Sequence, residues 1–154
     1  MFVIHSKSGK EIKATVRKLD TKEILSINKD KFHFNWRTEI SYNVYMLTAD
    51  GIEGALGLIS IEDRSMDYAI QIRLLACAKE NMGSGKKYDR IAGCLIAFAC
   101  MEAFKSGYGG YICLKPKTIL KEHYQEMYGF TSTKLFLVSQ GQNSLALINK
   151  YYEK

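Results

Sequence analysis

The sequence predicts an α/β protein with a mixed, twisted central sheet flanked by helices, and three observations lead to it. The first half of the 154 residues alternates apolar and polar side chains, as half-buried strands do. The second half has an uncharged run over residues 91–101, then a short strand and a second helical pattern. Hydrophobic residues make up 47% of the chain, enough for one core. We therefore expect one domain over residues 1–154, because strands joined by helical crossovers build such a sheet.

The first half is expected to hold strands with one helical insert. Asp50-Gly51 predicts a tight hairpin turn, because such turns favour residues that tolerate positive φ. Asp20 is expected to start the helical insert. The expected elements are a strand over residues 11–19, a short helix over residues 20–27, and antiparallel strands over residues 42–47, 52–61 and 68–77.

The second half is expected to alternate helices and strands. A helix begins near Arg90 and ends before Gly107. A short strand then reaches Leu114, and the turn Lys115-Pro116-Lys117 leads to a helix over residues 118–128. Gly129 stands at the C′ position of that helix, where glycine is favoured. A strand over residues 135–138 and a helical segment over residues 142–151 complete the chain.

The start of the helix near Arg90 has the composition of an anion site. Residues 83–87 (Gly-Ser-Gly-Lys-Lys) bring positive charge and small side chains to a first turn that contains Ala92 and Gly93. Free N–H groups and the helix dipole both favour an anion there, which indicates a phosphate-bearing cofactor. Composition alone also fits a plain core helix that packs closely on a sheet, with Asp89 as an ordinary N-cap.

The order of loop, apolar helix, strand, helix and Gly-Phe (residues 129–130) resembles the GNAT superfamily of acetyl-CoA-dependent N-acetyltransferases. Its pyrophosphate motif, Gln/Arg-x-x-Gly-x-Gly/Ala, opens a long apolar helix. One register places Glu80, Gly83 and Gly85 on the motif but requires an overlong segment before Gly107. The register of Lys87, Arg90 and Ala92 leaves an ordinary helix and is preferred, with Arg90 where the family has Gly.

The resemblance implies an N-acetyltransferase that binds acetyl-CoA, and the spacing of the cysteines predicts no metal site. It places the pyrophosphate on the backbone of residues 88–93. From their charges we also expect phosphate contacts from the side chain of Arg90 and, second to it, those of Lys86 and Lys87. It places the pantetheine on the backbone of the strand over residues 70–77. The residues that the resemblance assigns to the cofactor are Leu75, Ala76, Cys77, Lys87, Tyr88, Asp89, Arg90, Ile91, Ala92 and Gly93.

The resemblance also implies a catalytic tyrosine shortly before Gly-Phe, and Tyr124 is the candidate. It lies five residues before Gly129, where the family commonly has four. A phenol with a pKa near 10 can protonate a departing thiolate without being ionised at neutral pH. Tyr124 also fits simple packing on a helical face, and His123 or Tyr128 could replace it as the acid.

No general base and no acceptor site stand out in the sequence. Four glutamates lie near expected strand ends, where a carboxylate can be either a base or a solvated charge: Glu39, Glu53, Glu62 and Glu80. His5 and His33 are too far from His123 in sequence to indicate a shared site. The aromatic group Phe32, Phe34 and Trp36 fits core packing better than an acceptor pocket.

Composition narrows the class of protein. Residues 1–4 are too short for a signal segment and no apolar run approaches a membrane span, which predicts a soluble, cytoplasmic protein. The four cysteines lack metal spacing and are expected to be buried, reduced thiols. The net charge of +6 is compatible with nucleic acid, but the basic residues form only short clusters, which a phosphorylated cofactor explains as well. We therefore consider nucleic acid the less favoured partner. We expect the acceptor to be a small-molecule or peptide amine. A homodimer is possible. The rival function is a CoA-binding module without catalytic activity.

Overall fold

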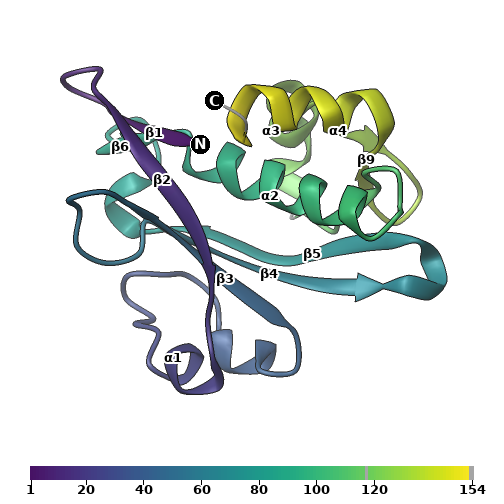
Figure 1. Cartoon of the computed structure of the whole chain (residues 1–154), viewed down its shortest axis with the longest axis horizontal. Helices are drawn as coiled ribbons and strands as arrows, with labels where there is room; N and C mark the ends of the chain where they lie inside the picture. The colour runs from purple at the N-terminus through teal and green to yellow at the C-terminus, as the bar shows by residue number, and fades with distance from the viewer. Residues whose placement is uncertain (117, 153–154) are drawn as a thin grey trace.

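The computed structural model describes residues 1–116 and 118–152, and it has one mixed sheet with helices on both faces (Figure 1). The nine strands are ordered β6-β1-β2-β3-β4-β5-β7-β9-β8. The β5–β7 pair is parallel, and the other neighbouring pairs are antiparallel. The predicted fold class is confirmed.

The elements follow one another with short connections. The strands are β1 (Phe2–His5), β2 (Glu11–Lys18), β3 (Asn43–Ala49), β4 (Gly57–Arg64), β5 (Ala69–Cys77), β6 (Tyr88–Asp89), β7 (Ile112–Leu114), β8 (Thr131–Ser132) and β9 (Leu137–Ser139). The helices are α1 (Thr21–Leu25), α2 (Ile91–Lys105), α3 (Thr118–Tyr128) and α4 (Gly141–Leu147), with short 3-10 turns η1 (Trp36–Glu39), η2 (Ser65–Asp67) and η3 (Lys79–Asn81) and a terminal π-helical turn η4 (Ile148–Tyr152).

Most expected elements are present, and the largest difference lies in the first hairpin. β3 and β4 pair antiparallel as predicted, but β4 begins at Gly57 and not at Ile52. Gly51 does turn the chain with a φ of +74°. The Ile52 N–H then bonds to the Ala49 carbonyl, and pairing resumes only where the Leu56 N–H reaches the Leu47 carbonyl. The predicted turn at Asp50-Gly51 is therefore present, but the prediction that the second strand starts at Ile52 was wrong, because a loop over residues 50–56 joins β3 to β4.

Three strands have no counterpart in the sequence prediction, namely β1, β6 and β8. Each is short, and each borders a strand that is far from it in the chain or follows a turn.

The predicted turn at Lys115-Pro116-Lys117 includes Lys117, which lies outside the described residues. The helix after Asp20 is shorter than predicted, and Asp20 caps it in a reciprocal capping box with Glu23.

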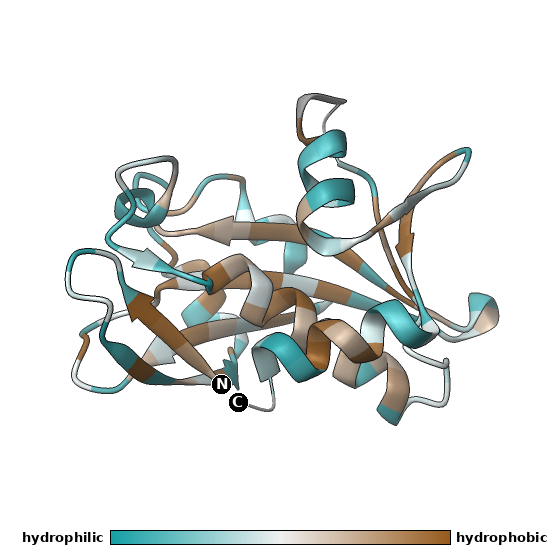
Figure 2. Cartoon of the chain, turned by 90° about the horizontal axis from the view of Figure 1, so that it is seen from above, coloured by the Kyte–Doolittle hydropathy of each residue, from teal (hydrophilic) through white to brown (hydrophobic). Residues whose placement is uncertain are grey.

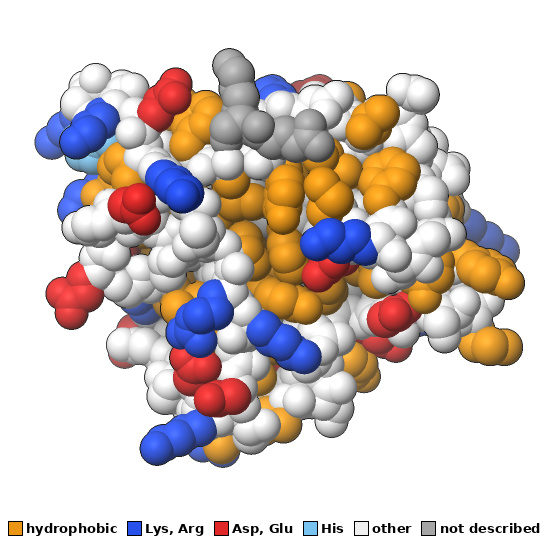
Figure 3. Space-filling model, in the orientation of Figure 1, with side chains coloured by type: hydrophobic (Ala, Val, Ile, Leu, Met, Phe, Trp, Pro, Cys, Tyr) orange, Lys and Arg blue, Asp and Glu red, His pale blue; other side chains and the backbone are white. Residues whose placement is uncertain are grey.

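The two faces of the sheet carry different helices. α2 packs against β4, β5 and α4 on one face, whereas α1 and η1 cover part of the other face. Figure 2 shows α2 coloured hydrophobic along most of its length and α3 largely hydrophilic. In Figure 3, which has the orientation of Figure 1, apolar side chains gather near the middle of the visible face, with charged side chains around them. The uncharged run over residues 91–101 is thus explained by burial against the sheet.

Gly57 on β4 has no side chain, and this lets the start of α2 lie close to the sheet. A Cβ on Gly57 would lie 2.6 Å from the Ile91 side chain, closer than atoms can pack. Gly93, one turn into the helix, leaves room in the same way for the ring of Tyr151, which would be 2.3 Å from a Cβ. Glycine at these two positions therefore lets α2 begin close to β4 and lets η4 pack against the first turn of α2.

Three observations on the described part of the chain concern membrane-spanning helices, metal ligands and cysteines. No helix there is long and apolar enough to cross a membrane. No group of three or more potential ligands gathers into a metal site among those residues. The four cysteines are free; Cys94, Cys100 and Cys113 are buried and Cys77 is partly buried.

Candidate active site

The two parallel strands separate in the middle of the sheet and open a cleft. β5 pairs with β7 only from Ile70 to Ile72, opposite Ile112 to Leu114. β7 ends there, whereas β5 continues to Cys77. The β5–β4 register shifts at the same point, so that Arg73 is an extra, bulged residue. The backbone of β5 beyond Arg73 therefore lacks a strand partner on its β7 side and faces the cleft.

The cleft contains a cavity of about 1030 Å³ between the end of β5, the start of α2 and the inner side of α3. This volume suits a ligand larger than most drug-sized molecules. Nine of the residues predicted for the site line it: Leu75, Ala76, Cys77, Tyr88, Asp89, Arg90, Ile91, Ala92 and Tyr124. Lys87 lines a smaller cavity beside it, and Gly93 is buried beneath Tyr151.

Arg90 is the residue before α2 and has the backbone conformation of a glycine, with a φ of +80°. A non-glycine residue rarely adopts this region, and its side-chain contacts explain why Arg90 does. Nε donates to the Phe2 carbonyl at 3.1 Å and Nη2 to the Lys150 carbonyl at 2.7 Å. The guanidinium also stacks on the rings of Phe2 and Tyr151. Arg90 thus links β1 and η4 to the start of α2.

This arrangement bears on the expected role of Arg90. Two carbonyls and two rings already engage the side chain, so the helix start offers chiefly its backbone to a ligand. The first intrahelical bond is from the Cys94 N–H to the Arg90 carbonyl. The N–H groups of Ile91, Ala92 and Gly93 precede it and have no partner within the helix. Contact between the Arg90 side chain and phosphate stays a prediction.

A lysine and an aspartate stand in front of this helix start. Asp89 accepts from the Arg90 N–H at 2.7 Å and from Lys86 Nζ at 3.0 Å. Burial raises the pKa of Asp89, but these two donors outweigh burial and leave the pKa below its usual value. The carboxylate is therefore ionised at neutral pH and offsets the charge of Lys86 when no anion is present.

Cys77 and Tyr124 both line the cavity, and both are protonated at neutral pH. Burial raises the pKa of Cys77 to about 11, although Lys86 and the Ala92 N–H favour the thiolate. Burial and the neighbouring Cys77 raise the pKa of Tyr124 above 10. The ring of Tyr124 packs edge-on to Phe130 at 5.9 Å between centroids. Tyr124 thus presents a phenol that is a proton donor at neutral pH.

The two alternatives to Tyr124 differ in their surroundings. His123 lines the same cavity but is exposed, and its ring lies 6.0 Å from that of Tyr124. Tyr128 is 7% exposed, and burial raises its pKa far more than that of Tyr124. Deep burial makes Tyr128 a weaker acid than Tyr124, whereas His123 retains access to solvent.

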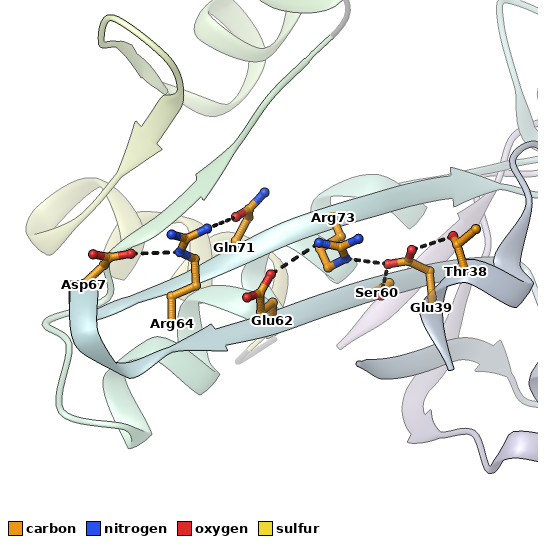
Figure 4. Close-up of polar contacts among 8 residues, drawn as sticks. All are labelled: Thr38, Glu39, Ser60, Glu62, Arg64, Asp67, Gln71 and Arg73. Atoms are coloured by element: carbon orange, nitrogen blue, oxygen red, sulfur yellow. Dashed lines mark hydrogen bonds and ion pairs between the residues drawn. The ribbon is translucent and has the colours of Figure 1, made fainter. Parts of the chain in front are cut away.

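A buried ion pair, which the sequence did not reveal, adjoins the cavity at the bulge (Figure 4). Glu39 is 2% exposed and accepts from Arg73 Nε at 2.8 Å, Ser60 Oγ at 2.8 Å and Thr38 Oγ1 at 2.7 Å. Burial raises the pKa of Glu39, but these donors outweigh burial and leave it below its usual value. Arg73 also reaches Glu62 at 3.3 Å and stacks on a tyrosine ring.

The glutamates and aromatic residues considered as base or acceptor pocket lie mostly outside the cavity or are already paired. Glu39 is a structural anion with a low pKa and little capacity as a base, Glu53 is exposed, and Glu80 lies 3.9 Å from a lysine. Phe32 and Trp36 are buried in the core beneath the sheet. Phe34 differs from these two aromatics, because it lines the cavity with a φ of +83°.

Asn81 is a further polar residue in the cavity wall, and no motif pointed to it. It is 4% exposed, and its Oδ1 accepts from the Tyr88 N–H at 3.0 Å. That bond fixes the orientation of the amide, because only oxygen can accept. Among the described residues, Nδ2 of Asn81 is the buried side-chain atom left without a partner. Asn81 therefore positions the backbone of Tyr88 in β6, just ahead of the start of α2.

Comparison with solved structures places this cleft in a known fold. A protein described as a streptothricin acetyltransferase from Bacillus anthracis, in complex with acetyl coenzyme A, matches with a TM-score of 0.62 and 11% identity over 83% of this chain and 97% of that one. An acetyltransferase described as GNAT from Desulfovibrio desulfuricans matches at 0.59 and 8%, over 83% and 99%. An IAA acetyltransferase from Bacillus cereus matches at 0.57 and 14%, over 79% of each chain.

These likenesses confirm the resemblance at the level of the fold: the chain has the fold of the GNAT acetyltransferases. No family model and no curated protein sequence matches it. At 8–14% identity, the side chains of the site have to be argued from their own chemistry.

Proposed function

We propose that the chain binds acetyl-CoA in the cleft between β5 and β7 and transfers its acetyl group to the amine of an acceptor. The supporting observation is the separation of β5 from β7 with the free N–H groups of α2 at one end of the cavity and Tyr124 in its wall. Several of the similar structures, among them that from Bacillus anthracis, hold this cosubstrate. The whole chain acts as one domain in this proposal.

The residues present fit the cosubstrate in two respects. The open edge of β5, including Leu75 and Cys77, offers backbone donors and acceptors to the two amides of a pantetheine arm. The first turn of α2 offers N–H groups to a pyrophosphate, and Ala92 keeps side-chain bulk low there. When bound, the cosubstrate supplies an activated acyl group as a thioester.

The protein's own contribution to the reaction is orientation and one proton. The cleft holds the acyl group at the β5 bulge, where a neutral amine can reach it. A new carbon–nitrogen bond then replaces the carbon–sulfur bond, the amine loses one proton, and the sulfur gains one. In this proposal the Tyr124 hydroxyl, which lines the cavity, gives its proton to sulfur and is reprotonated from solvent, and solvent takes the proton that the amine loses. The acceptor is a small-molecule or peptide amine.

The rival function is a CoA-binding module without turnover, and one observation favours it. Glu39, the buried carboxylate beside the cavity, is ion-paired and has a lowered pKa, so it does not accept a proton from an ammonium group near neutral pH. Both functions require acetyl-CoA to bind. Thermal unfolding with and without acetyl-CoA is the first test, because a hundredfold excess over Kd adds about 2.7 kcal/mol. No stabilisation would overturn both functions.

Replacing Ala92 by valine should weaken acetyl-CoA binding by at least about tenfold, a loss of about 1.4 kcal/mol. The added methyl groups would crowd the first turn of α2, where the pyrophosphate has to approach the backbone. Calorimetric titration with acetyl-CoA measures the change, and circular dichroism confirms folding. Ala146→Val on the exposed side of α4 is the matched control and should bind as the wild type does. Unchanged affinity in Ala92→Val would show that the cofactor site is misplaced.

A further inference from the structure

A second, smaller cavity adjoins the proposed cofactor cleft at the start of α2. Its volume is about 400 Å³, and it shares Lys86 with the large cavity. Its wall comes from the end of β1, the turn after it, η3 and the loop before β6: His5, Lys7, Glu80, Gly85, Lys86 and Lys87. We call it the basic recess.

The charges around the basic recess favour an anion. Lys7, Lys86 and Lys87 carry three positive charges against the single carboxylate of Glu80. Glu80 also lies 3.9 Å from Lys31 Nζ, which compensates part of its charge from outside the recess. Asp89 pairs with Lys86 on the side of the large cavity. The ammonium groups of Lys7 and Lys87 have no ion-pair partner among the described residues.

The backbone around the basic recess is fixed by hydrogen bonds. The Ser6 N–H donates to the Lys87 carbonyl at 2.9 Å, and the Lys87 N–H donates to the Glu80 carbonyl at 2.9 Å. His5 pairs with Tyr88 in the β1–β6 ladder. The Ser8 N–H donates to His5 Nδ1 at 3.3 Å, which places the proton of the neutral imidazole on Nε2. The recess thus has a donor-rich wall held in place by two strands.

We infer that the basic recess binds the 3′-phosphate of coenzyme A and so selects the complete cosubstrate over dephospho-CoA. This inference rests on the proposed function. The pyrophosphate is assigned to the start of α2, and the ribose that carries the 3′-phosphate is attached directly to that pyrophosphate. The 3′-phosphate is the remaining anionic group of coenzyme A, and as a phosphate monoester it matches a wall of several ammonium donors.

Coenzyme A and dephospho-CoA form the ligand pair for the test, because they differ only in this phosphate. Calorimetry at low salt should show that the wild type binds coenzyme A about tenfold more tightly, the range of one charge-assisted bond. Lys7→Met and Lys87→Met should each reduce that ratio to about threefold, and the double variant should bring it close to one. Affinity for dephospho-CoA should not change in Lys7→Met. Higher salt should reduce the ratio, because both lysines are exposed.

Lys105→Met at the far end of α2 is the matched control, since it removes the same charge without touching the recess. Its ratio should remain about tenfold. Equal affinity of the wild type for the two ligands would overturn the inference and leave the proposed function intact. The same conclusion holds if the preference survives in the double variant. If neither ligand binds, the proposed function itself fails, and the inference fails with it.

Discussion

Replacing Arg73 by methionine should destabilise the protein by about 3 kcal/mol, at the low end of the range for breaking a buried ion pair. The variant leaves the Glu39 carboxylate, which is 2% exposed, without its cationic partner. The low end applies because the Arg73 side chain keeps 28% of its surface exposed and water already reaches it. Urea unfolding at pH 7 measures the loss. Arg64→Met removes an arginine from the exposed pair with Asp67 and should cost less than about 1 kcal/mol.

The effect of Arg73→Met should depend on pH in a defined direction. In the wild type the pKa of Glu39 lies below its unfolded value of 4.5, so this pair stabilises the fold above that pH and its contribution is lost as pH falls further. In the variant uncompensated burial raises the pKa of Glu39 above the unfolded value. The variant therefore regains stability as pH falls from 7 toward 4.5, and the difference from wild type narrows.

A double variant separates the ion pair from simple packing. Adding Glu39→Gln to Arg73→Met removes the unpaired buried charge, so the double variant should lose less stability than the sum of the two single variants. If Arg73→Met instead costs no more than Arg64→Met at pH 7, the Glu39 carboxylate is not dependent on Arg73, and its lowered pKa has another origin.

The sequence predicted what depends on local rules. Alternation over residues 11–19 identified β2, and Gly129 ended α3 because its φ of +70° favours glycine. The start of α2 also followed from a local pattern of small residues and an uncharged run. These are features in which neighbouring residues determine the outcome.

The sequence did not predict contacts between distant segments. Arg73 and Glu39 are 34 residues apart, and Arg90 bonds to carbonyls 88 and 60 residues away. β1 is only four residues long, and it is paired by β2 and β6. One signal was available: Arg73 is a charged residue within the apolar run of β5, and such a residue requires a buried partner.

The positive φ of Arg90 shows how a departure from a motif can be compensated by the fold. The resembled family has glycine at this position, and the structure gives Arg90 the conformation that glycine adopts readily. Bonds to the Phe2 and Lys150 carbonyls stabilise the side chain that glycine would lack. The start of α2 thus keeps the backbone conformation of glycine although the residue is an arginine.

Replacing Tyr124 by phenylalanine should lower turnover by about a hundredfold or more, the effect of losing a general acid. Only the hydroxyl is removed, so the edge-on packing against Phe130 and the affinity for acetyl-CoA should be retained. Release of free thiol from acetyl-CoA, measured with an amine panel, gives the rate. Tyr108→Phe is the matched control, because it removes a tyrosine hydroxyl that bonds to Asp63 and does not line the cavity. It should leave turnover unchanged.

The pH dependence of the same variant distinguishes proton donation from packing. The pKa of Tyr124 is raised above 10 by burial, so the wild type keeps its donor across neutral pH and loses it only in strong base. Without the hydroxyl, the departing thiolate depends on solvent or on His123 for its proton. The ratio of Tyr124→Phe turnover to wild-type turnover should therefore rise as pH falls, because protonation of the amine affects both proteins alike, whereas a packing role would lower that ratio equally at every pH. Wild-type kcat in Tyr124→Phe would remove this residue from the reaction, and absence of turnover in the wild type across the amine panel would favour the silent CoA-binding module.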